Sequence, residues 1–164
     1  MPSKSDKYVQ GKLNRLQDND EGYQDILRRL EMEFEVTVGV IGDKASQAHE
    51  GSEETVVEIG TKHEFGIDVP KRSFIRDTVD AHQSDIQDLQ RIAGKKLLDR
   101  RRKRLEKIPE AFGLVVVGMI QERIAAGIPP ENSEETIERK GSSTPLIDTG
   151  QLRSSITHKV EVKK

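Results

Sequence analysis

The sequence predicts a small α+β domain in which a small antiparallel sheet packs against two to three helices, with long irregular loops between them. Three segments repeat apolar residues at three- and four-residue spacing, which is typical of amphipathic helices. Two others alternate β-branched and polar residues, as strands with one buried face do. We assign residues 21–164 to a single domain and the polar residues 1–20 to a flexible arm or a weakly docked helix.

The helical pattern begins near Tyr23 and continues for about three turns in the first segment. A second, long helix is expected to start at a cap formed by Asp77 or Thr78 and to end before Pro109. Between them, the segment that ends at Phe65 fits either a strand or a short helix, and we favour the helix.

Residues 109–127 carry the broadest apolar surface of the chain and are predicted to form the central core helix. Pro109 suits the first turn, where a backbone N–H would have no helical partner. Gly113 and Gly118 lower the helix propensity of this segment. We interpret both glycines as places where a neighbouring element comes close.

The clearest strand covers residues 35–42, in which three valines alternate with other residues. Val160 and Val162 alternate with charged residues near the other end of the chain and predict a terminal edge strand paired with the first. Polar segments with glycine or proline predict long loops at residues 43–54, 66–78 and 128–150, the last broken by a short turn.

Residues 141–156 combine more turn and capping signals than any other stretch. The residues that carry these signals are Pro145, Leu146, Asp148, Thr149, Gly150 and Leu152. Proline fixes one backbone angle, glycine permits unusual ones, and Asp or Thr can accept hydrogen bonds from the free N–H groups that open a helix. We expect an ordered loop ending in a helical turn that presents its apolar side chains either to the core or to another subunit.

No local pattern of catalytic or metal-binding residues stands out in the sequence. The four histidines are scattered, and the His63 segment lacks the second histidine of a zinc-peptidase motif. There is no cysteine, no serine in a nucleophile turn and no glycine-rich phosphate loop. The longest apolar run, residues 114–117, is too short to cross a membrane. We therefore expect no enzyme, no cofactor and no membrane partner.

One segment is strongly basic, although the formal net charge of the chain is only −2. Its cations are Lys95, Lys96, Arg100, Arg101, Arg102, Lys103, Arg104 and Lys107. On the helix that we expect over residues 95–107, these charges would surround most of the circumference. Clustered cations can bind DNA phosphates through counterion release. A solvated helix or a salt-bridge network between subunits would have the same composition.

Several motifs together resemble the virion-morphogenesis and tail-completion proteins of Mu-like and related tailed bacteriophages. An EFG turn leads to a P-x-R-x-F-I-R run at residues 70–76. A glycine-to-proline turn follows at 127–130, then a T-I-x-x-K-G step at 136–141 and a P-L-x-D-T-G-x-L-x-x-S-I signature at 145–156. The resemblance covers about residues 32–162, but the loop at 43–54 and the arginine run are not part of the family pattern.

The resemblance implies a small α+β protein without catalysis that assembles as a homo-oligomeric ring at the neck or the top of the tail. Its partners would be other neck, connector or tail-tube proteins, and its location the virion, with the host cytoplasm during assembly. We expect Phe65, Pro70, Phe74 and the 145–156 segment to order loops or form subunit interfaces. The alternative is a DNA-binding accessory protein that uses the basic helix at 95–107.

Overall fold

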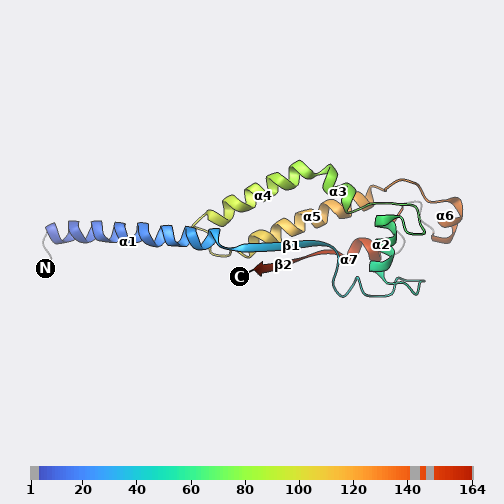
Figure 1. Cartoon of the computed structure of the whole chain (residues 1–164), viewed down its shortest axis with the longest axis horizontal. Coiled ribbons are helices and arrows are strands. Elements are labelled where there is room, and N and C mark those ends of the chain that lie inside the picture. Colours follow the sequence, from blue (N-terminus) through green and yellow to red (C-terminus); the bar gives the residue numbers. More distant parts are fainter. Residues whose placement is uncertain (1–3, 141–144, 147–149, 164) are drawn as a thin grey trace.

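The computed structural model describes residues 4–140, 145–146 and 150–163, and these residues form an α+β fold as predicted (Figure 1). In chain order the elements are α1 (Lys4–Leu30), β1 (Glu33–Val40), α2 (Val56–Phe65), α3 (Arg76–Ala81), α4 (Gln83–Leu98), α5 (Lys107–Ala125), α6 (Glu134–Lys140), α7 (Gln151–Ser155) and β2 (Ile156–Lys163). The two strands pair antiparallel, α5 packs along them, and α4 lies over α5. α1 extends away from this body along the long axis of the molecule.

The two-stranded sheet has one apolar and one charged face, which explains the alternating sequence pattern. β1 and β2 are in register from Glu33 opposite Lys163 to Val40 opposite Ile156. The valines of β1 are partly buried on the side that α5 covers. On the other face, the ammonium of Lys163 lies 2.6 Å from the carboxylate of Glu35. The two predicted strands and their pairing are confirmed.

Helix α5 is the central core helix, as predicted. Its side chains Val116, Ile120 and Ile124 are buried. They belong to a core cluster with Val56, Phe74, Ile128, Leu146, Leu152 and Ile156. Because these residues come from the end of α5 and from the segments around α2 and α7, the centre of the core lies at that end of α5, far from α1 (Figure 1).

The two glycines inside α5 have different surroundings. A Cβ on Gly113 would lie 2.4 Å from Cδ2 of His158 on β2, so the close approach predicted for Gly113 is confirmed. The His158 ring also contacts Glu110, one turn before Gly113, at 2.8 Å. A Cβ on Gly118 would meet nothing within 4 Å, and the same prediction is wrong for that residue.

Helix α2 resolves the ambiguity in the segment that ends at Phe65. It begins with a capping box, in which Thr55 Oγ1 accepts from the N–H of Glu58 at 3.3 Å and the Glu58 carboxylate accepts from the N–H of Thr55 at 2.7 Å. It ends at Gly66, which has a φ of 74°. A start signal at Thr55 and a stop signal at Gly66, with ten residues between them, specify a helix here, so the helical prediction is confirmed.

The segment after the irregular residues 66–75 differs from the single capped helix that was predicted. It forms two helices, α3 and α4, which meet at His82. Neither Asp77 nor Thr78 is the cap, because the helix already begins at Arg76. The Thr78 hydroxyl instead donates to the carbonyl of Phe74 within the first turn, at 2.6 Å.

The prediction of one basic helix over residues 95–107 is wrong for residues 99–106. α4 ends at Leu98, and residues 99–106 form an irregular connection with turns. The Asp99 carboxylate accepts from both the backbone N–H and the guanidinium Nε of Arg101 at 3.1 Å, and these hydrogen bonds hold the pKa of Asp99 below its usual value. A side chain that binds the backbone N–H two residues later favours a turn over continued helix.

The N-terminal residues 4–30 form one continuous helix, so the expected boundary between residues 20 and 21 does not coincide with any structural break. Of the two predictions for the first residues, an arm or a weakly docked helix, the structure has the helix. The buried side chain of Arg29 attaches the C-terminal end of α1 to the rest of the domain. The guanidinium donates to the carbonyls of Leu97 at 2.9 Å, Asp99 at 3.1 Å and Arg102 at 3.1 Å.

Candidate functional site

The motif segments that resemble the phage family come together at the end of the domain opposite α1. The guanidinium of Arg72 donates to the carbonyl of Pro130 from Nε at 2.9 Å and from Nη2 at 2.7 Å, and Nη2 also reaches the carbonyl of Glu131 at 3.2 Å. Arg72 is only 5% exposed, and its burial lowers its pKa. These hydrogen bonds tie the run at 70–76 to the turn at 127–130.

Glu64 ties the EFG turn to the same run. Its buried carboxylate accepts from the backbone N–H of Ile75 at 2.9 Å and of Arg76 at 3.0 Å, which are free donors at the start of α3. Its carbonyl accepts from the hydroxyl of Ser73 at 2.9 Å. Glu64 therefore caps the start of α3, the role that was predicted for Asp77 or Thr78.

The apolar residues of these motifs divide into buried and exposed groups. Phe74, Pro145, Leu146 and Leu152 are buried in their own domain, so they pack within the subunit and are not available to a neighbouring one. Gly150 has a φ of 77° and directly precedes α7, consistent with the helical turn that was expected there. The predicted capping residues Asp148 and Thr149 lie outside the described residues.

Phe65 is the predicted interface residue that the structure places clearly on the surface, where it is 57% exposed. Its ring lies 5.9 Å from the guanidinium carbon of Arg76. Val57 and Val79 are also exposed beside it, and the three apolar residues line a hollow of about 480 Å³ between α2 and α3. We call Val57, Phe65 and Val79 the Phe65 patch. Pro70 is exposed as well, in the irregular segment nearby.

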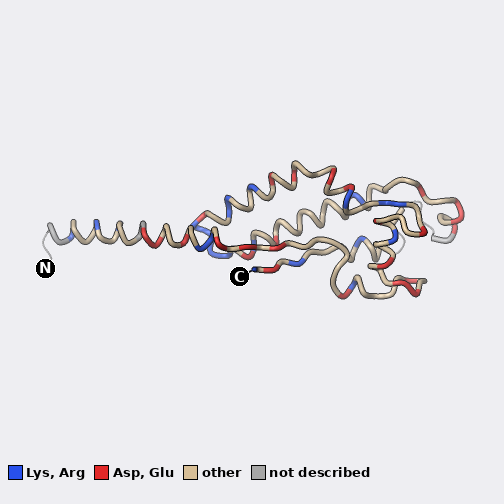
Figure 2. The backbone as a smooth tube through the Cα atoms, in the orientation of Figure 1, with Lys and Arg blue, Asp and Glu red and all other residues tan. Residues whose placement is uncertain are grey.

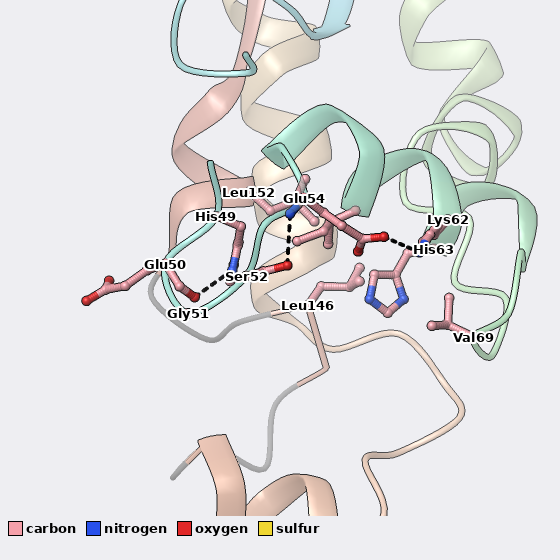
Figure 3. A pocket seen from close by; sticks show the side chains of 11 residues that line it. His49, Glu50, Gly51, Ser52, Glu54, Lys62, His63, Val69, Leu146 and Leu152 are labelled. Atoms are coloured by element: carbon pink, nitrogen blue, oxygen red, sulfur yellow. Dashed lines mark hydrogen bonds and ion pairs between the residues drawn. The ribbon is translucent and has the colours of Figure 1, made fainter. Parts of the chain in front are cut away.

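A second hollow of about 520 Å³ lies beside the motif segments (Figure 3). Glu54 and Lys62 form an ion pair across it, and this carboxylate raises the pKa of Lys62. Ser52 accepts from the N–H of Glu54 at 3.1 Å. These contacts order the loop before α2, while Leu146 and Leu152 supply the apolar wall. No group of three potential metal ligands occurs among the residues that the structure describes.

The predicted phosphate-binding residues gather where α1 meets the body (Figure 2). Lys95 and Lys96 lie in the last turn of α4, while Arg100, Arg101, Arg102, Lys103 and Arg104 follow in the connection to α5. All seven are exposed, and the Arg101 side chain is 92% exposed. The guanidinium of Arg100 lies against Gly22 of α1, where a Cβ would come within 2.4 Å of it. We call residues 100–104 the basic loop.

Helix α1 carries an apolar seam that was not predicted from the sequence. Val9, Leu13, Leu16, Tyr23 and Leu30 are large apolar residues that are exposed on this helix. Their spacing of three, four or seven residues was available as a signal. The charged and amide residues between them hid it, because polar residues outnumber apolar ones in this segment.

Comparisons with protein-family models, with curated proteins and with solved structures find no match to this chain. Among the described residues, no helix is both long and apolar enough to span a membrane. Function is therefore inferred from the motifs, from their arrangement in the fold and from the exposed surfaces.

Proposed function

We propose that this chain is a structural virion protein of a tailed bacteriophage or prophage that acts in tail completion or head–tail joining. It does so by assembling into a ring at the neck or the top of the tail. The observation that supports this proposal most is that hydrogen bonds from Arg72 and to Glu64 connect the motif segments. Segments that resemble one family, and that are up to 60 residues apart in the chain, form one structural unit.

The way these polar groups are used favours a scaffold over a catalytic centre. Arg72 and Glu64 bind backbone carbonyl and N–H groups, and Ser73 binds a backbone carbonyl. Buried polar groups satisfied in this way hold irregular backbone in a fixed shape. A shape fixed in this manner is what a subunit needs to present constant surfaces to its neighbours.

A ring requires two different complementary surfaces on each subunit. The exposed apolar surfaces of this chain that could take part include the Phe65 patch at one end of the molecule and the seam of α1, which extends from the other end. Both are apolar and in contact with water in the single chain, so assembly would bury surface that folding leaves exposed.

Analysis of particles from the phage or induced prophage that encodes the chain tests this proposal. Mass spectrometry of purified particles should detect the chain, and gold-labelled antibody should mark the junction of head and tail. Absence of the chain from purified particles, or label on the capsid shell alone, would contradict the proposal.

A second candidate function is DNA binding, and the exposed basic loop is the observation that favours it. The cations are on an irregular connection that Arg29 holds through the carbonyls of Asp99 and Arg102, and not on the helix that was predicted. Clustered exposed cations attract the phosphate backbone without reading sequence. A neck protein through which DNA passes would use the same contact transiently.

A further inference from the structure

Helix α1 carries an apolar seam that its own chain does not cover. Val9, Leu13, Leu16, Tyr23 and Leu30 are between 52% and 65% exposed. Four of them, Val9, Leu16, Tyr23 and Leu30, are spaced by one heptad, and Leu13 falls at the intervening position. A seven-residue apolar repeat of this length is typical of a helix that packs along another helix.

The attachment of α1 to the body is confined to its base. Arg29 binds the connection after α4, and Gly22 lies against Arg100. Beyond Gly22, the helix extends away from α4 and α5 (Figure 1). Most of the stability of helices in proteins comes from packing of an apolar face, so the uncovered seam on this helix of 27 residues points to a packing partner.

Helices α4 and α5 also leave apolar side chains exposed to water. α4 contains no buried residue. Ile92 on α4 is 41% exposed, and Val115 across from it on α5 is similarly exposed. Between the two helices lies a groove of about 230 Å³ whose apolar lining includes Leu89, Ile92, Ile108, Phe112 and Val115. We call it the α4–α5 groove. A third helix would cover its apolar lining.

Charge is distributed along α1 and α4 in opposite order (Figure 2). α1 is basic near its start, at Lys7, Lys12 and Arg15, and acidic further on, at Asp20 and Glu21. α4, which forms one wall of the groove, is acidic near its start and basic at its end. Its charges are Asp85 and Asp88, followed by Arg91, Lys95 and Lys96, and the basic loop comes next in the chain. Opposite charges therefore align between residues 7–21 of α1 and residues 85–96 of α4 when α1 runs parallel to α4.

We propose that α1 of one copy of this chain docks its apolar seam into the α4–α5 groove of a second copy. Its own groove is out of reach, because α1 leaves the body in the opposite direction. The part of the seam from Val9 to Tyr23 spans about 21 Å and can lie along α4, whose 16 residues span about 24 Å, while Leu30 remains near the base of α1.

Charge alignment fixes the polarity of this contact. Asp20 and Glu21 of the donor lie beside Lys96 and Arg102 of the recipient, and Lys12 of the donor lies towards Asp85. The contact joins two different surfaces, so it either closes reciprocally as a pair or propagates from copy to copy into a ring. This contact does not depend on the virion role, because it involves only copies of the chain.

Cysteine cross-linking tests the contact directly, because the sequence has no native cysteine. The two single variants Leu13→Cys and Ile92→Cys are mixed at full length and oxidised. We expect disulfide-linked species that contain one chain of each variant. In the matched control Gln87→Cys replaces Ile92→Cys, since Gln87 is exposed on the face of α4 turned away from the groove, and cross-linking should fall to background.

Two results would overturn the proposal. One is cross-linking of Leu13→Cys only to itself, which would show that α1 pairs with another α1. The other is equal cross-linking of Leu13→Cys to the Ile92 and Gln87 positions, or to neither.

Light scattering gives an independent measurement. The double variant Leu13→Gln with Leu16→Gln changes exposed side chains, so its helix content and melting temperature as a monomer should match those of the control Arg15→Gln. We expect the wild type and the control to form a dimer or a larger assembly and the double variant to be monomeric. A monomeric wild type at the highest soluble concentration, or an unchanged mass in the double variant, would overturn the proposal.

Charge reversal tests the polarity. The double variant Lys12→Glu with Arg15→Glu should reduce assembly, and Asp85→Lys with Asp88→Lys on the same chain should restore it. If the second pair of changes weakens assembly further, the polarity that we propose is wrong.

Discussion

The side chain of Arg72 holds the carbonyl oxygen of Pro130 with two hydrogen bonds, although the two residues are 58 positions apart. The guanidinium belongs to a buried side chain, and hydrogen bonds from a charged donor contribute more to stability than neutral ones. Two motifs that are separate in the sequence are thus joined by one side chain, in addition to the packing of Phe74 and Ile128 in the core.

Replacement of Arg72 should destabilise the domain without changing its secondary structure. Arg72→Ala removes a buried charged donor that bonds the carbonyls of Pro130 and Glu131, and we expect a loss of about 1–3 kcal/mol in the free energy of unfolding. Arg72→Lys keeps the charge but loses the forked geometry and should be intermediate. Urea unfolding followed by circular dichroism measures both. Arg91→Ala, which removes an exposed ion pair with Asp88, is the control and should change stability by less than about 0.5 kcal/mol.

Replacement of Glu64 should weaken the start of α3. Glu64→Ala removes the acceptor for the N–H groups of Ile75 and Arg76, and we expect a loss of about 1–3 kcal/mol. Hydrogen exchange at these two amides should accelerate more than exchange in α5. Unchanged protection of both amides would show that another group caps α3.

The two glycines of α5 provide a matched pair of alanine substitutions. Gly113→Ala places a methyl group against the His158 ring, and we expect a loss of about 1–3 kcal/mol from overpacking. Gly118→Ala meets no neighbour and should stabilise the helix by up to about 1 kcal/mol. Thermal unfolding of the two variants should therefore shift in opposite directions. A shift in the same direction would contradict the packing described between α5 and β2.

The basic loop predicts salt-dependent DNA binding if the second candidate function is correct. Neutralisation of Arg100, Arg101 and Arg102 to glutamine should abolish retention on duplex DNA at low salt. Wild-type retention should fall steeply as salt increases. A wild-type chain that does not bind duplex DNA at low salt would exclude this function.

Local periodicity was sufficient to predict the sheet and the core helix. β1 and β2 follow from alternating valines, and α5 from its broad apolar surface, because both patterns are set by burial against one neighbouring layer. The burial of Phe74 and Leu146 was not decided by the sequence, since an apolar residue in an irregular segment can pack inside its own subunit or against another.

Contacts between distant residues explain the predictions that failed. The cap of α3 comes from Glu64, which precedes the helix by about eleven positions and reaches it only after α2 and the following turn have formed. The basic segment is not helical because Asp99 forms a turn and because Arg29, some 70 residues earlier, binds the carbonyls of the connection. The partners of Arg29 lie about 70 positions away, so no local window contains both, whereas the turn at Asp99 is a local signal that joins residues two positions apart.

The most direct test of the central claim uses the phage or prophage that encodes this chain, with its gene deleted. We predict that the deletion produces separate heads and tails, seen by electron microscopy, and few infectious particles. Addition of the purified full-length protein to that lysate should join them and restore infectivity, and the Arg72→Ala variant should be less effective. Normal, infectious particles in the absence of the chain would contradict a role in tail completion or head–tail joining.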